Sequence, residues 1–131
     1  MRLLLDTHIW VWSLAEPEKL TRRVRRELAN KENEAWLSPI SIWEVLMLAE
    51  VGKLAAPVGT EGWVKRALQS VPLKEAPLTY EVALETRKLS LHNSDPADRF
   101  LVATAKVYGL ALVTADRRLI EAEEIQILAN Q

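Results

Sequence analysis

The sequence predicts a three-layer α/β fold with a central parallel sheet, in a single domain that spans residues 1–131. Short apolar segments that resemble strands alternate with longer segments that resemble helices along the whole chain. This alternation is typical of a parallel sheet that is covered by helices on both faces. The chain is long enough for one substantial core, and 49% of its residues are hydrophobic.

The predicted strands are short and largely apolar. The first two cover residues 2–5 and 34–37, and the last two cover residues 110–113 and 125–128. A weaker strand is expected over residues 73–76, between Pro72 and Pro77.

Capping residues and prolines mark the predicted helices. Ser38 followed by Pro39 is a strong start signal for a helix that runs to about Glu50. Asp95 and Pro96 start another helix, and Gly109 is a typical residue for its C-terminal end. The remaining helices are expected over residues 7–15, 22–30, 61–70, 80–90 and 116–122.

Composition excludes several classes of protein. Cysteine is absent, so that a disulfide framework, a thiol nucleophile and a thiolate zinc site are impossible. No apolar stretch approaches the roughly 18 residues of a membrane span, and the start of the chain resembles a strand rather than a signal peptide. We therefore expect a cytoplasmic protein. The net charge of −1 argues against a strong general nucleic-acid binder. This objection is limited, because cations bound by acidic residues would add positive charge to the surface.

The four aspartates all lie at the ends of predicted elements: Asp6, Asp95, Asp98 and Asp116. A parallel sheet brings the carboxyl ends of its strands and the starts of its helices to one edge, where such folds bind ligands. Carboxylates gathered there are hard oxygen ligands suited to Mg²⁺ or Mn²⁺. Each aspartate also has a simpler interpretation as a helix N-cap, and the two roles are compatible.

Glu44 is the least ordinary acid of the chain. Its helical neighbours at three and four residues are Ile40, Ser41, Met47 and Leu48, so it does not lie on a solvated face. A charged glutamate in such surroundings is costly unless it is paired or bound to metal. A buried glutamate satisfied by an arginine or a backbone amide is the alternative. We expect Glu44 to meet the aspartates at the same edge of the sheet.

The aromatic and imidazole residues carry weaker signals. His8 and His92 lack the paired spacing of metal ligands, so we expect neither to bind metal. Five tryptophans are many for 131 residues. We expect Trp43 to lie in the core and some of the others to form an exposed apolar patch, which would indicate a protein partner.

Four motifs in this order resemble those of PIN-domain proteins, specifically the toxin ribonucleases of VapBC-type toxin–antitoxin pairs. They lie at residues 4–8 (LLDTH), 41–44 (SIWE), 95–103 (DPADRFLVA) and 112–116 (LVTAD). Each motif alone is weak, but the set is specific in so short a chain, and the similarity covers essentially all of it. The resemblance implies Mg²⁺- or Mn²⁺-dependent endoribonuclease activity on an RNA substrate, a cognate VapB-like antitoxin and a homodimer.

The resemblance also implies roles for individual residues. Matched position by position, Asp6, Glu44 and Asp98 are the core catalytic metal ligands, and Asp116 fills a fourth, more variable acidic position. Asp95 belongs to the Asp-Pro-x-Asp-Arg signature of one branch of the family.

Hydroxyl and basic residues complete the expected site. Thr114 matches a hydroxyl residue that is commonly found beside the acids in the family. Arg99, Arg117 and Arg118 are placed to contact RNA phosphates, with surface solvation or salt bridging as the alternative.

Two other classes of function stay open at this point. A metal-dependent phosphatase or a receiver-like domain also gathers aspartates at strand ends, but a phosphatase favours a second aspartate where this chain has His8. A receiver-like domain would need a lysine after a late strand. In this chain the strand that ends at Val113 is followed by Thr114, Ala115 and Asp116 instead. The second class is a non-catalytic interaction module, in which the acids are only caps; metal-dependent RNA cleavage separates it from a nuclease.

Overall fold

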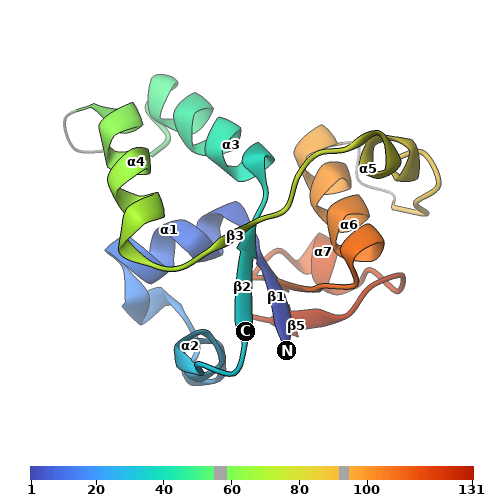
Figure 1. The fold of residues 1–131 in the computed structure, drawn as a ribbon, viewed down its shortest axis with the longest axis horizontal. Helices are drawn as coiled ribbons and strands as arrows, with labels where there is room; N and C mark the ends of the chain where they lie inside the picture. Colours follow the sequence, from blue (N-terminus) through green and yellow to red (C-terminus); the bar gives the residue numbers. More distant parts are fainter. Residues whose placement is uncertain (55–58, 92–94) are drawn as a thin grey trace.

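The computed structural model describes residues 1–54, 59–91 and 95–131, and these form a five-stranded, all-parallel sheet with the strand order β3-β2-β1-β4-β5 (Figure 1). The central strand is β1 (Arg2–Leu5), which lies between β2 (Glu34–Leu37) and β4 (Ala111–Thr114). The edge strands are β3 (Lys74–Glu75) and β5 (Ile127–Ala129). The predicted fold class is confirmed.

Side chains that alternate along β1 face two separate cores. Leu3 and Leu5 face the first core, and Leu4 faces the second. The first core is completed by α1 (Thr7–Ala15), α2 (Arg22–Ala29), α3 (Pro39–Glu50) and α4 (Thr60–Ser70). The second is completed by α5 (Tyr80–Glu85), α6 (Pro96–Tyr108) and α7 (Arg117–Ile120). Helices therefore cover both faces of the sheet, as in a three-layer fold.

Side-chain caps place the starts of several helices at the carboxyl edge of the sheet. The side chains of Asp6, Ser38, Asp95 and Asp116 each accept a backbone N–H in the first turn of α1, α3, α6 and α7. Such a cap stabilises a helix by about 1 kcal/mol. The simpler interpretation of Asp6, Asp95 and Asp116 as caps is thus confirmed.

The helix predicted over residues 80–90 is shorter than expected and ends at Glu85. Leu89 is buried in the second core, and the backbone N–H and the hydroxyl of Ser90 both donate to Glu124 Oε1, at 2.7 and 2.5 Å. These contacts with a distant segment draw the chain away from the helical path.

The prediction that Trp43 belongs to the core is wrong, because 53% of its surface is exposed. Ser41 and Val45, four residues apart on α3, are the buried residues of that helix. Trp43 lies between them in sequence and therefore projects from the opposite side of the helix. Trp10 of α1 is buried instead, with its ring 5.7 Å from that of Trp63.

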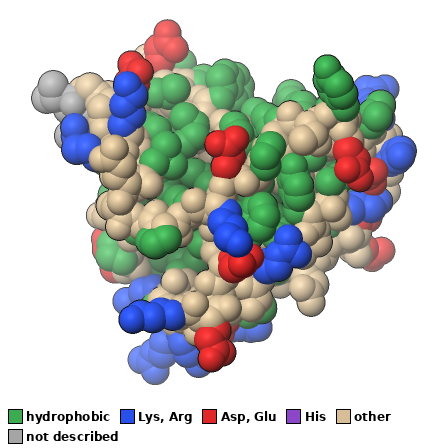
Figure 2. All heavy atoms as spheres, in the orientation of Figure 1, with side chains coloured by type: hydrophobic (Ala, Val, Ile, Leu, Met, Phe, Trp, Pro, Cys, Tyr) green, Lys and Arg blue, Asp and Glu red, His purple; other side chains and the backbone are tan. Residues whose placement is uncertain are grey.

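The surface has distinct apolar and basic regions. Figure 2 shows hydrophobic side chains gathered across the face that carries α3, α4 and α5, and Lys and Arg side chains near α2 at the lower left. The exposed arginines of α2 are Arg22, Arg23, Arg25 and Arg26. Within the described ranges, no helix has the length and apolar character needed to cross a membrane.

Candidate active site at the carboxyl edge of the sheet

Asp6 lies where β1 meets α1. Its backbone N–H donates to the carbonyl of Val113 at 3.0 Å, which fixes it to the neighbouring strand. Its carboxylate accepts the N–H of Thr7 at 2.8 Å and the hydroxyl of Thr114 at 2.6 Å. Burial raises the pKa of Asp6, and the nearby charge of Asp116 adds to that rise, whereas the hydrogen bond from Thr114 opposes it. Thr114 thus lies beside the acids, as the resemblance implied.

Glu44 is held by hydroxyl groups rather than by the arginine or amide that the alternative foresaw. Thr7 Oγ1 donates to Glu44 Oε1 at 2.5 Å and also lies 2.9 Å from Ser41 Oγ. Burial is the main cause that raises the pKa of Glu44, and the negative charges of Asp6 and Asp95 raise it further. Three acids from β1, α3 and the start of α6 therefore share one electrostatic environment.

Asp98 and Asp116 are joined by an arginine. Asp98 is buried in the first turn of α6, and Asp116 caps α7. The guanidinium of Arg118 donates to both carboxylate oxygens of Asp116, at 3.2 Å from Nε and 2.8 Å from NH2, and its NH2 lies 3.6 Å from Asp98 Oδ2. These hydrogen bonds hold the pKa of Asp116 below its usual value. The backbone N–H of Asp116 donates to Thr114 Oγ1 at 3.0 Å, which links this pair to Asp6 through one hydroxyl.

Arg99 has a structural role that the sequence did not reveal. Its NH1 and NH2 groups donate to the backbone carbonyls of Thr86 and Leu91, each at 3.0 Å. The guanidinium thereby ties α6 to the segment that follows α5. Contact between Arg99 and RNA stays a prediction.

Asp95 and His8 lie at the rim of the site. Asp95 is exposed and accepts the N–H of Ala97 at 3.0 Å, and its charge acts on Glu44. His8 is also exposed, and it slightly favours the charged forms of the nearby acids Asp6 and Glu44. His92 falls outside the described residues.

The donor chemistry of the site fits a hard divalent cation, since it consists of carboxylate and hydroxyl oxygens. In the conformation of residues 1–54, 59–91 and 95–131, however, no three acidic or imidazole side chains stand close enough together to hold one ion. In this conformation Arg118 pairs with Asp98 and Asp116, and the hydroxyls of Thr7 and Thr114 donate to Glu44 and Asp6. Coordination therefore requires side-chain rotation, above all of Arg118.

Sequence reasoning found the acids but missed the roles of Thr7 and Ser41, and it named salt bridging by Arg118 only as the alternative to RNA contact. The hydroxyls gave no signal, because serine and threonine are common and the hydroxyl of Thr7 donates to Ser41 and Glu44, which lie 34 and 37 residues away in the chain. Arg118 did have a local signal: it lies two residues after a helix-capping aspartate, within reach of that carboxylate.

Comparison with known proteins identifies the family of the chain. A family model described as the PIN domain matches residues 3–125. Ribonuclease VapC22 of Mycobacterium tuberculosis is 33% identical over 118 residues, which cover 89% of this chain and 88% of that protein.

Two solved structures show the same fold. A chain of the DNA-bound VapBC from Salmonella typhimurium gives a TM-score of 0.72 at 19% identity, over 100% of this chain and 99% of that chain. A chain of VapBC2 from Rickettsia felis, bound to a DNA fragment from their promoter, gives 0.71 at 15% identity over 98% of both chains. The family model and the relative from M. tuberculosis together show that the chain belongs to the PIN-domain family, in its VapC-type branch.

Proposed function

We propose that the protein is a divalent-metal-dependent endoribonuclease that hydrolyses RNA phosphodiester bonds and acts as the toxin of a type II toxin–antitoxin pair. The observation that carries this proposal is that Asp6, Glu44, Asp98 and Asp116 all lie at the carboxyl edge of the sheet in a PIN-domain chain, where their charges act on one another or share Arg118. The relative that is 33% identical is itself a ribonuclease by name, and VapC nucleases of this family generally depend on a divalent metal.

The proposed roles follow from the contacts of each side chain. Asp6, Glu44, Asp98 and Asp116 would hold Mg²⁺ or Mn²⁺. When bound, the ion supplies Lewis acidity, which makes water a better nucleophile and stabilises charge on the phosphate oxygens. Thr114 and Thr7 orient the carboxylates of Asp6 and Glu44 through their hydroxyls. Asp95 adds a further negative charge at the rim, where it would attract the cation.

The direct test is cleavage of defined RNAs by the purified protein, with Mg²⁺, with Mn²⁺ and with chelator. We expect cleavage inside the RNA chain only when metal is present, and we expect Asp98→Asn to abolish it. A DNA of the same sequence and an aryl phosphate serve as comparison substrates. Metal-dependent hydrolysis of the aryl phosphate alone would point to a phosphatase, and inertness toward every substrate would favour the non-catalytic interaction module.

The partners that we propose are a VapB-like antitoxin and a second copy of the chain. The structural relatives in Salmonella typhimurium and Rickettsia felis are VapBC complexes. In this chain, the exposed apolar residues include Trp43 and Leu46 of α3 and Tyr80 and Leu84 of α5. By contrast, Trp10 and Val11 are buried and Trp12 is half-buried, so the segment around them offers little free surface.

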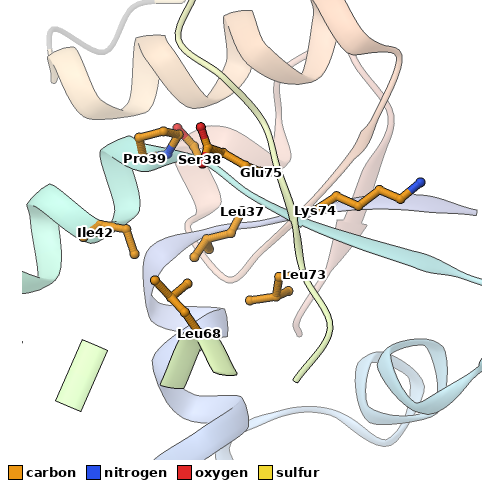
Figure 3. A pocket seen from close by; sticks show the side chains of 8 residues that line it. All are labelled: Leu37, Ser38, Pro39, Ile42, Leu68, Leu73, Lys74 and Glu75. Carbon is orange, nitrogen blue, oxygen red and sulfur yellow. The ribbon is translucent and has the colours of Figure 1, made fainter. Parts of the chain in front are cut away.

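A pocket lined by residues of β2, α3, α4 and β3 lies beside Ile42, the neighbour of Trp43 on α3. Its volume is about 220 Å³, and Figure 3 shows the side chains of Leu37, Ile42, Leu68 and Leu73 turned toward one another there, whereas Lys74 points away. Sedimentation at micromolar concentration tests the dimer, and binding of the product of a neighbouring small gene tests the antitoxin. Trp43→Asp should weaken association, whereas wild-type protein that sediments only as a monomer would contradict the dimer.

We further propose that residues 1–131 act as one PIN-like domain in the cytoplasm, where RNA is available. Limited proteolysis that leaves residues 3–125 as one resistant fragment would support the domain proposal, because the family model matches that range. Cell fractionation tests the location.

A further inference from the structure

The guanidinium of Arg118 contacts two acids of the candidate site. The Arg118 guanidinium uses Nε and NH2 to engage both oxygens of Asp116, and NH2 also approaches Asp98 to 3.6 Å. Asp116 and Asp98 come from different helices, α7 and α6. One cationic side chain therefore neutralises two carboxylates from separate elements.

A divalent cation bound by these carboxylates would need the same oxygen lone pairs. Asp116 has both of its oxygens engaged by the guanidinium, and Oδ1 also accepts the N–H of Arg118. A bound ion and a guanidinium that share these oxygens would also repel each other strongly at such short range. Binding of these carboxylates by Arg118 therefore opposes binding by a metal ion, and the reverse holds as well.

Arg118 can leave the acids without disturbing the fold. Its side chain is 62% exposed, so that it has solvent into which it can rotate. The cap of α7 survives this rotation, because Asp116 Oδ1 still accepts the backbone N–H of Arg118 at 2.9 Å. An exposed ion pair contributes only about 0.2–1 kcal/mol, which a metal ion can readily overcome.

We propose that Arg118 is an internal competitor of the divalent metal: its guanidinium holds Asp98 and Asp116 until a cation displaces it. The inference rests on the proposed function, since it takes these two aspartates to be acids of the metal site. Arg118 thus sets the metal concentration at which the site fills, and it acts from within the chain, before any partner binds.

The experiment compares Mn²⁺ affinity, measured by electron paramagnetic resonance of the free ion, in wild type and three variants. Arg118→Ala should tighten the dissociation constant by about three- to tenfold, which corresponds to the loss of one ion pair and one repulsive charge. Arg117→Ala is the matched control, because it removes the same charge from the adjacent exposed residue. It should change the constant by less than about twofold. Arg118→Lys, which keeps the charge but loses the planar fork, should fall between wild type and Arg118→Ala.

A second readout uses the wild-type chain only, so that it does not depend on the folding of a variant. In ¹⁵N-correlated spectra, the Arg118 Nε–H signal should shift in step with Mg²⁺ binding as the guanidinium leaves Asp116. An unchanged Arg118 signal at saturating Mg²⁺ would overturn the inference.

The outcomes separate the inference from the function on which it rests. If wild type binds Mn²⁺ and Arg118→Ala binds it equally or more weakly, Arg118 does not compete with metal, while the proposed metal site stands. If both alanine variants bind Mn²⁺ more tightly by the same factor, the effect comes from the net charge of the protein and not from the contact of Arg118 with the acids. That result would also overturn the inference. If neither wild type nor Arg118→Ala binds Mn²⁺, the proposed metal site itself is wrong.

Discussion

The hydroxyl of Thr7 lies 2.5 Å from Oε1 of Glu44, so the first turn of α1 is hydrogen-bonded to the middle of α3. Thr7 is only 1% exposed, and it directly follows Asp6 in the chain. Adjacent residues thus position two acids that lie 38 residues apart: Asp6 through its own backbone and Glu44 through the side chain of Thr7.

Thr7→Val should lower both stability and activity. The substitution keeps the volume but leaves Glu44 without its hydroxyl donor, at a cost of about 1–3 kcal/mol in the free energy of unfolding. Thr7→Ser, which retains the donor, is the control and should stay near wild type. Chemical denaturation and RNA cleavage measure the two effects. A valine variant as stable and active as wild type would show that this hydrogen bond does not position Glu44.

The amide substitutions Asp6→Asn, Glu44→Gln and Asp98→Asn should each lower RNA cleavage by about a hundredfold or more, and double variants should lose little beyond that. Groups that act as one unit are strongly non-additive. Circular dichroism should show all three proteins folded, because each amide has nearly the shape of the acid. Glu32→Gln, at an exposed position in the turn before β2, is the matched control. Full activity in any one of the three would remove that residue from the site.

Divalent metal should raise the melting temperature, and protons should oppose it. A ligand at a hundredfold excess over its dissociation constant stabilises the folded state by about 2.7 kcal/mol. Burial raises the pKa of Asp6 above its usual 3.8 and that of Glu44 above its usual 4.5, so protons compete for these carboxylates at higher pH than for ordinary acids. The shift caused by Mg²⁺ should therefore shrink as the pH falls from neutral toward the raised pKa values of these two acids, as expected for ligands that must be deprotonated.

Without metal, the same raised pKa values should make the wild-type protein less stable as the pH rises. The folded state holds protons that the unfolded chain has already lost, so this stability is complete below the usual pKa values of 3.8 and 4.5 and disappears as the pH rises through the raised ones. Asp116 has the opposite effect, because its pKa is lowered in the folded state. Its contribution to the free energy of unfolding is present above its usual pKa and is lost as the pH falls through the lowered one. In chelator, the gain in stability of Asp6→Asn over wild type should thus be largest above the raised pKa of Asp6 and should decrease as the pH falls toward 3.8. A gain that is constant with pH would contradict this assignment.

Arg99→Ala should destabilise the fold rather than abolish RNA binding directly. The substitution removes two hydrogen bonds to the carbonyls of Thr86 and Leu91. A hydrogen bond from a charged group contributes about 1.5–3 kcal/mol to the free energy of unfolding. Arg87→Ala, at an exposed neighbouring position, is the control. Thermal melting and RNA affinity at low temperature separate the two roles. An Arg99→Ala protein with wild-type stability and weakened RNA binding would restore the role in phosphate contact.

The features that could be predicted from sequence are those with local causes. A capping residue acts within its own turn, so Asp6, Ser38 and Asp95 marked helix starts that the structure confirms. Because a parallel sheet brings these starts to one edge, the gathering of the acids there also followed from the order of elements. The candidate site was thus largely defined by residues at element ends.

The features that sequence reasoning missed depend on contacts between distant segments. α3 carries apolar residues around much of its circumference, and such a pattern does not reveal which side faces the core, so Trp43 was misplaced. The early end of α5 depends on Ser90 meeting Glu124, 34 residues further along the chain. The expected role of Arg99 likewise overlooked two backbone carbonyls that only the folded chain presents.

The double role of Asp6, Asp95 and Asp116 as helix caps affects how the gene can change under selection. Asparagine caps a helix about as well as aspartate. If Asp6 holds metal as proposed, a population in which the active protein is harmful can reach an inert version by the substitution Asp6→Asn without producing a misfolded chain. The inert protein would keep its abundance and its outer surface. On that proposal, loss of activity and loss of fold are separate evolutionary events for this molecule.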